Sequence, residues 1–223
     1  STLDAVTKGI GDVIPIQVVF NEAVVVQGTP TLALETGTND ATAAYASGSG
    51  TNTLTFNYTV ASPHVASDLD YKATTSLALP TNSDTIRDTL STNGTLTLPS
   101  PGGTGSLGAN EAIGIDGVRP SVSGLAANAG TTTVTLTMSE AVSGSPDGSD
   151  FTVTNAAGQT NTVTAATVAS NGGSIALKLT NMIPNDASIS VTYAQNEAGN
   201  KQLKDANGNA VVSITSGQAV TVT

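Results

Sequence analysis

Apolar and polar residues alternate in short runs along most of this chain of 223 residues. Clear runs are residues 14–20 (IPIQVVF), 53–60 (TLTFNYTV) and 133–138 (TVTLTM). A period of two residues places one face of a strand in a core and the other face in solvent, as in antiparallel sheets. The same reasoning predicts further strands at 31–36, 41–46, 69–79, 95–98, 111–115, 151–154, 162–168, 174–180, 187–194 and 210–222. Strands at this spacing, separated by Gly, Asn, Asp and Pro, predict an all-β sandwich fold.

An internal repeat sets the number of domains. Segment 16–24 (IQVVFNEAV) aligns with segment 134–142 (VTLTMSEAV), so that a predicted strand is followed by Glu-Ala-Val in both halves. Self-similarity of this kind is the sequence signature of a repeated structural unit. We therefore expect two tandem Ig-like (Greek-key) β-sandwich domains, residues 1–116 and 117–223.

Composition and charge narrow the classes of partner. Aromatic residues make up 3% of the chain and Trp is absent, so the cores are expected to be thin and aliphatic. Seven Lys and Arg against 17 Asp and Glu give a net charge of −10, which repels nucleic-acid phosphates and anionic lipid headgroups. Divalent cations are the natural counter-ions. The chain has no Cys, and therefore no disulfide, thiolate metal site or Cys nucleophile.

No apolar run approaches the ~20 residues that span a bilayer, so we expect no membrane insertion. No signal peptide opens the chain either, and Ser1 is expected to be the start of an excised segment.

Both halves resemble repeats of bacterial surface proteins. Residues 11–37 (GDVIPIQVVFNEAVVVQGTPTLALETG) and 67–79 (SDLDYKATTSLAL) resemble the Ig-like and cadherin-like extender repeats of large biofilm-associated and RTX-type adhesins. Residues 116–142 (DGVRPSVSGLAANAGTTTVTLTMSEAV) and 203–211 (LKDANGNAV) are similar to SwmB-type surface repeats. The resemblance implies an extracellular module on the bacterial cell surface, flanked by neighbouring repeats of the same polypeptide. It also implies calcium at domain junctions, although this junction offers only Asp116, where cadherin-type linkers concentrate several acids.

Calcium binds six to eight oxygen atoms, so a site needs several carboxylates and carbonyls that converge from loops. The run 205–209 (DANGN) presents three oxygen-bearing side chains at alternate positions, but its Gly is misplaced for an EF-hand. The predicted calcium ligands lie at loop ends and are Glu22, Asp68, Asp70, Asp88, Asp116, Glu140, Asp205, Asn207 and Asn209. The alternative for each is a solvated turn residue or a carboxylate that accepts backbone N–H bonds.

The sequence does not predict an enzyme. His64 is the single histidine, with no second His or Cys for a transition metal and no Gly-x-Ser-x-Gly elbow in the chain. Asp68 and Asp70 form a carboxylate pair, but a glycosidase cleft also needs aromatic platforms, and the few aromatic residues fall at core positions.

We therefore expect a monomeric structural extender, the stalk module of a secreted adhesin in cell adhesion and biofilms, with a host-surface or matrix ligand for the parent protein. Two alternatives stay open. One is a ligand-binding adhesin module that recognises a glycan or peptide through loops such as 61–68 or 98–110. The other is a surface-layer or fibre subunit, in which exposed edge strands pair between chains.

Overall fold

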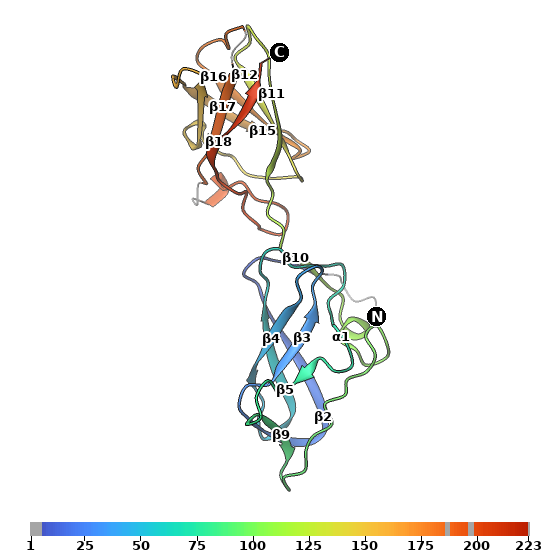
Figure 1. Ribbon diagram of the computed structural model, residues 1–223. Helices are drawn as coiled ribbons and strands as arrows, with labels where there is room; N and C mark the ends of the chain where they lie inside the picture. The colour runs from blue at the N-terminus through green and yellow to red at the C-terminus, as the bar shows by residue number, and fades with distance from the viewer. Residues whose placement is uncertain (1–5, 186–187, 196–198, 223) are drawn as a thin grey trace. The chain divides into compact units, whose positions relative to one another are not determined.

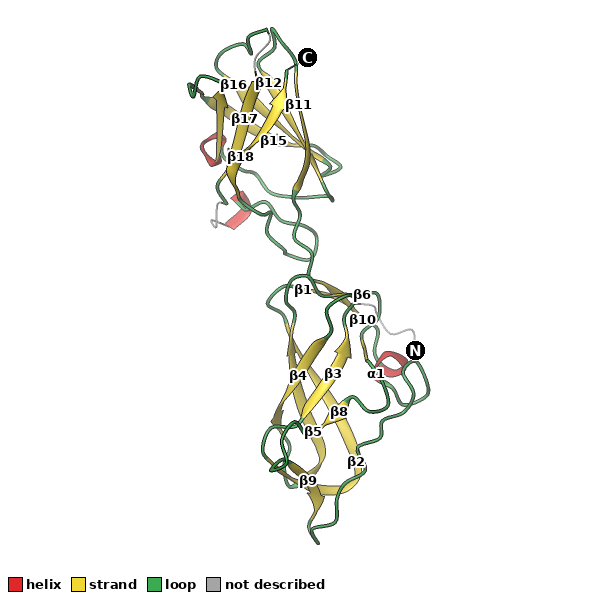
Figure 2. Ribbon diagram, in the orientation of Figure 1, coloured by secondary structure: helices red, strands yellow, loops and turns green. Residues whose placement is uncertain are grey.

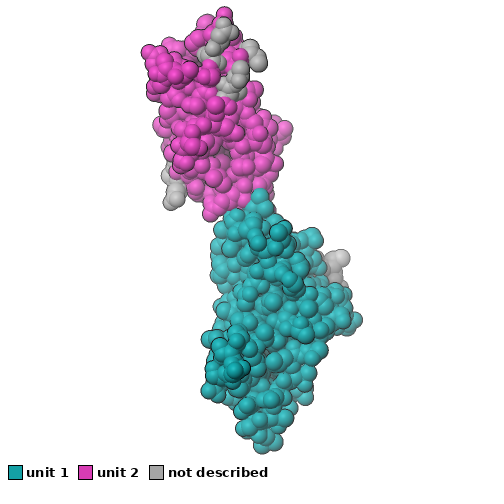
Figure 3. Space-filling model, viewed as in Figure 1, with its two compact units in different colours: residues 1–118 teal, residues 119–223 magenta. Residues whose placement is uncertain are grey.

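The computed structural model describes residues 6–185, 188–195 and 199–222. The chain divides into two compact units, residues 1–118 and 119–223 (Figure 3). Each unit has its own hydrophobic cluster. Strands make up most of the regular structure in both units (Figure 2), which confirms the all-β fold class. In the described part of the chain, none of the helices has the length and apolar character needed to cross a membrane.

Unit 1 is built on a seven-stranded sheet in the order β7-β3-β4-β5-β2-β9, with β8 paired to β3, and on a small sheet in the order β1-β10-β6 (Figure 1). Its elements are β1 (Val6–Gly9), β2 (Val13–Gln27), β3 (Thr31–Glu35), β4 (Ala41–Ser47), β5 (Thr51–Thr59), β6 (Val65–Ala66), β7 (Asp70–Tyr71), β8 (Leu77–Ala78), β9 (Thr85–Asp88), α1 (Leu107–Asn110) and β10 (Ile113–Asp116).

Strand β2 is the longest element of unit 1. It pairs with β5 from Val13 opposite Thr59 to Val19 opposite Thr53, and the register then shifts before Val24. A shift of this kind is a β-bulge, which bends a strand and leaves some residues unpaired. Beyond the bulge β2 pairs with β9 through Val24–Gln27. Glu22 therefore lies inside a strand, and the prediction that it follows a strand was wrong.

Unit 2 consists of two four-stranded sheets, β11-β12-β16-β15 and β14-β13-β17-β18. This order matches the A-B-E-D and C′-C-F-G sheets of an Ig-like sandwich. Its elements are β11 (Val122–Ala127), β12 (Thr133–Met138), η1 (Gly148–Asp150), β13 (Phe151–Asn155), β14 (Thr160–Asn161), β15 (Val163–Val168), β16 (Ser174–Leu179), β17 (Ser188–Tyr193), η2 (Gly199–Lys201) and β18 (Ile214–Thr221).

Both cores are mainly aliphatic, as the composition predicts. In unit 1 the side chains of Leu32, Leu54 and Phe56 are fully buried, and in unit 2 those of Leu136 and Leu177 are. Burying one such side chain contributes roughly 1.5–3 kcal/mol to the stability of the folded state. Each unit therefore has enough buried apolar surface to hold its own sheets together.

The predicted strands differ from the observed ones in a few places. Segment 69–79 contains only the two short strands β7 and β8, and residues 95–98 form no strand. The first residue of the predicted strand 187–194 lies outside the described residues. Strands β1, β6, β9, β11 and β14 were not predicted, and the strand predicted at 210–222 begins only at Ile214. In β11, the sequence VSGLAA alternates weakly and contains Gly and Ala, which are poor strand formers.

Candidate functional site

The loop 205–209 of unit 2 is organised around the Asp205 carboxylate. Asp205 Oδ1 accepts hydrogen bonds from the backbone N–H groups of Asn207 at 2.8 Å and Asn209 at 2.9 Å, and Oδ2 accepts one from Asn209 Nδ2 at 2.8 Å. Asp205 is 5% exposed and Asn209 is 2% exposed. The carboxylate therefore stabilises its own turn, as the alternative interpretation expected, and it lies in a buried position.

Glu140 lies close to this turn. It follows β12, as predicted, and one of its carboxylate oxygens lies within 4.8 Å of a carboxylate oxygen of Asp205. Two carboxylates at this separation disfavour each other's charge, and a cation bound to both would reverse that effect. Carboxylate and amide oxygens are also the ligands that calcium prefers. The predicted ligands Glu140, Asp205, Asn207 and Asn209 thus lie in one region of unit 2, and their chemistry fits a calcium ion.

Glu22 and Asp88 line a small cleft in unit 1. The cleft has a volume of about 310 Å³, lies beside the β2 bulge and is also lined by Asn21 and Asn93. Asp88 Oδ1 accepts hydrogen bonds from the N–H groups of Thr92 at 2.7 Å and Leu90 at 2.8 Å. The bond from Thr92 lowers the pKa of Asp88 below its ordinary value, so this carboxylate is charged at neutral pH.

Asp68 and Asp70 lie near helix α1. Asp68 Oδ1 accepts a hydrogen bond from Ile113 N–H at 3.3 Å, and Asp70 Oδ2 accepts one from Gly102 N–H at 2.9 Å. A Cβ atom added at Gly108 would lie 3.2 Å from Asp70 Oδ2 and 3.4 Å from Asp68 Oδ2. Both acids are therefore used to fix the loop around α1, and their role as calcium ligands stays a prediction.

Asp116 is the last residue of β10 in unit 1. Its Oδ1 accepts a hydrogen bond from Val118 N–H at 3.1 Å, which closes an Asx-type turn at the end of the unit. Calcium binding by Asp116 stays a prediction from the sequence.

His64 pairs with a buried tyrosine. Its Nδ1 lies 3.0 Å from Tyr58 Oη, and burial raises the pKa of Tyr58 to about 12. The phenol therefore stays neutral at physiological pH. The sequence analysis did not predict this pair, because the six-residue spacing alone does not show that a strand end and the following loop face each other.

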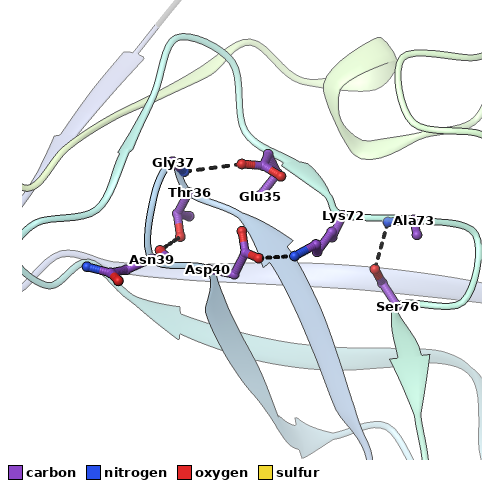
Figure 4. A network of polar contacts seen from close by, with 8 residues as sticks. All are labelled: Glu35, Thr36, Gly37, Asn39, Asp40, Lys72, Ala73 and Ser76. Atoms are coloured by element: carbon purple, nitrogen blue, oxygen red, sulfur yellow. Dashed lines mark hydrogen bonds and ion pairs between the residues drawn. The ribbon is translucent and has the colours of Figure 1, made fainter.

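An exposed ion pair joins two loops of unit 1. Lys72 Nζ contacts Asp40, while Thr36 Oγ1 donates a hydrogen bond to the carbonyl oxygen of Asn39 in the same loop (Figure 4). The hydrogen bond with Asp40 raises the pKa of Lys72 above its ordinary value. Lys72 is therefore a charged ammonium and not a nucleophile.

These observations define an Ig-like β-sandwich class of protein, and comparisons with known proteins add a family for part of unit 2. Residues 143–198 match a family model described as a putative flagellar system-associated repeat, the SWM repeat. This agrees with the resemblance of the second half to SwmB-type repeats. A comparison with curated protein sequences gives no match.

Two solved structures are similar to part of this chain. One is the N-terminal part of the bacterial S-layer protein SbsC, with 17% identity, a TM-score of 0.38 and coverage of 47% of this chain. The other is the S-layer protein rSbsC(31-844), with 19% identity, a TM-score of 0.39 and the same coverage. The matched part spans 24% and 14% of those two chains.

Proposed function

We propose that this chain is a structural extender module of a secreted bacterial surface protein of the adhesin type. The observation that supports this best is that two separate hydrophobic cores follow each other along the chain with very little sequence between them. Gly117 N–H is bonded to His64 O within unit 1, and Pro120 O is bonded to Val212 N–H within unit 2. Only Val118 and Arg119 lie between these anchored residues.

The described residues also support a passive role. Five candidate acids accept backbone N–H bonds that fix turns and loops, and these are Asp68, Asp70, Asp88, Asp116 and Asp205. His64 is paired with a tyrosine rather than with a nucleophile. The location on the bacterial cell surface rests on the resemblance of both halves to repeats of surface proteins, with a repeat-family match for residues 143–198.

Single-molecule pulling tests the extender function. A stalk module has to resist tension, and two separate cores predict two unfolding events, each releasing roughly 35–40 nm of chain at ~3.4 Å per residue. The Leu136→Ala variant is expected to lower the force of one event and leave the other unchanged, because Leu136 belongs to the core of unit 2. A single event, or extension without resistance, would contradict the proposal.

Two further measurements address the alternatives. Sedimentation at increasing concentration is expected to show a monomer, whereas a surface-layer or fibre subunit would associate. A glycan array is expected to show no binding, whereas a ligand-binding adhesin module would give a saturable signal with a specific glycan.

We also propose that calcium stabilises unit 2 through Glu140 and Asp205. A ligand that binds only the folded state, at about 100 times its dissociation constant, stabilises that state by ~2.7 kcal/mol. Thermal unfolding of the wild type is therefore expected to shift upward in calcium and return in chelator. Glu140→Gln should remove the shift, and Glu35→Gln in unit 1, at an exposed glutamate that is not a predicted calcium ligand, is the matched control that should retain it. Identical unfolding curves in calcium and in chelator would refute calcium binding.

A further inference from the structure

Equivalent strands in the two units have different neighbours. In unit 2, β12 pairs with β16 on one edge and with β11 on the other. The Glu-Ala-Val repeat aligns β12 with residues 16–20 of β2 in unit 1. There β2 pairs with β5 on one edge, and β9 reaches the opposite edge only at Val24–Gln27. Within the described residues, no strand occupies the position in unit 1 that β11 occupies in unit 2.

The backbone of this edge is directed outward. Asp12 O, just before β2, accepts a hydrogen bond from Val60 N–H, just after β5. In an antiparallel pair every second residue bonds to the same neighbouring strand. The even-numbered residues of β2 therefore direct their N–H and C=O groups toward β5. Gln17 and Val19 therefore direct their N–H and C=O groups to the open side. Pro15 also faces that side without an N–H group, as proline does on edge strands. In unit 2, β11 pairs with Val134–Met138, which align with Ile16–Phe20. A strand bound to β2 in the same register would therefore pair with Ile16–Phe20 and not with Pro15.

A cleft runs along the open edge. It has a volume of about 690 Å³ and lies between β2 and the coil that leads from β9 to α1, which runs alongside β2 in Figures 1 and 2. Its walls include Ile14, Ile16 and Leu98. On β2, the side chain of Val19 is 67% exposed. A volume of several hundred cubic ångströms with apolar walls is typical of a binding pocket.

The charges at the two ends of the edge give the incoming strand a direction. In unit 2, β11 runs antiparallel to β12 and starts with Val122 opposite Met138, the equivalent of Phe20. A strand bound to β2 in this way would begin beside the acids Glu22 and Asp88, at the end away from Lys8. Before β11, Arg119 precedes the first strand residue, Val122, by three positions. A basic residue at that place complements the two carboxylates.

We propose that the edge of β2 at Ile16–Phe20 binds an extended segment of another polypeptide, with small and apolar residues in alternation and a basic residue at its N-terminal end. The backbone hydrogen bonds of such an added strand supply affinity, and alternate side chains in the cleft supply specificity. This partner-binding surface goes beyond the extender function, which needs no partner in unit 1.

A synthetic peptide with the sequence of residues 118–128 (VRPSVSGLAAN) is a suitable probe for the full chain. We expect saturable binding, with slower amide exchange at Gln17 and Val19. Val19→Pro removes one outward N–H group and should weaken binding by ~10-fold or more, which corresponds to ~1.4 kcal/mol. Val19→Thr changes the side chain but keeps the N–H group, so it should weaken binding less than Val19→Pro does.

A charge exchange provides a second test that does not alter the strand. The peptide with Arg119→Glu should bind the wild type more weakly by ~10-fold, and Glu22→Lys in the chain should restore its affinity. Glu22 is exposed, so this substitution should not disturb folding. Lack of saturable binding, failure of the charge exchange to restore affinity, or protection confined to Thr135 and Thr137 of β12 would overturn the proposal. Self-association of the chain through this edge, without affinity for the peptide, would also overturn it.

Discussion

The Glu-Ala-Val repeat aligns two strands, β2 in unit 1 and β12 in unit 2, whose surroundings differ. In unit 2, β12 lies between β11 and β16, so both of its edges are paired. In unit 1, the first half of β2 has a paired edge on β5 and a cleft on the other side. Pro15 protects the start of the open edge, and a β-bulge ends it before Val24. Two aligned strands with the same alternation of residues, but with different sequences, can thus lie inside a sheet or leave one edge open.

Core truncations at equivalent positions should show the largest difference between the units. Leu136 of β12 is fully buried, and Leu136→Ala is expected to destabilise unit 2 by ~3 kcal/mol through lost contacts and a cavity. Val18, the equivalent residue of β2, is only partly buried beside the cleft, and Val18→Ala should cost ~1 kcal/mol in unit 1. Calorimetry of the full chain measures both. Equal losses would show that the cleft side of β2 is as well packed as β12.

Two glycines test the turns next to these strands, Gly28 in the turn after β2 and Gly130 in the turn before β12. Gly28 has a φ of +83°, and a Cβ atom there would lie 1.9 Å from Asp84 Oδ1. Gly130 also has a positive φ but has no atom within 4 Å of such a Cβ. Strain at a positive φ costs ~1–3 kcal/mol, so both Gly→Ala variants should lose stability and Gly28→Ala should lose more. Equal unfolding free energies for the two variants in denaturant would show that Asp84 moves away without cost.

Acid should weaken unit 1 through Asp84. Its carboxylate accepts hydrogen bonds from Thr81 N–H at 2.9 Å and Thr29 N–H at 3.3 Å, and the bond from Thr81 lowers the pKa of Asp84. A carboxyl group with a lowered pKa in the folded protein stabilises the folded state at pH values above its ordinary pKa. This stabilisation is lost as the pH falls through about 4 and below. The unfolding temperature of unit 1 should fall over this range. The Asp84→Asn variant should start lower at pH 7 and show a smaller fall, and an unchanged slope would refute this role.

The sequence predicted the parts of the fold that depend on local alternation. The observed β12 has the predicted bounds, Thr133–Met138, because its Thr and apolar residues alternate without interruption. Residues 95–98 (TLTL) also alternate but form no strand, since a strand needs a partner and the nearest edge is separated from them by the cleft. Long-range pairing of this kind is not encoded in the pattern of one segment.

The candidate site was predicted in part for the same reason. Asp205 and Asn209 were selected from their spacing, and the structure shows that their spacing serves the turn itself. The proximity of Glu140 to Asp205 follows from the sandwich topology, which places the end of β12 beside a loop about 60 residues further along the chain. The open edge of β2 was not predicted, because alternation is identical in strands with one or two neighbours.

The smallest effect is expected for the exposed ion pairs, of which the described residues show one in each unit. Lys72 pairs with Asp40 in unit 1, and Lys201 pairs with Asp147 in unit 2. Exposed pairs contribute little to stability, so Lys72→Met and Lys201→Met should change the unfolding temperature only slightly. Because both lysines are held charged, the intact mass should equal that of the uncrosslinked chain. A mass lower by one water, absent from Lys72→Met, would reveal an amide crosslink instead.

Amide hydrogen exchange of the free chain tests the comparison of the two strands most directly. The N–H groups of Gln17 and Val19 point to the open side of β2, and those of their equivalents Thr135 and Thr137 point toward β11. We expect fast exchange at Gln17 and Val19 and strong protection at Thr135 and Thr137 under the same conditions. Equal protection at all four amides would contradict it, because the edge of β2 would then already be paired.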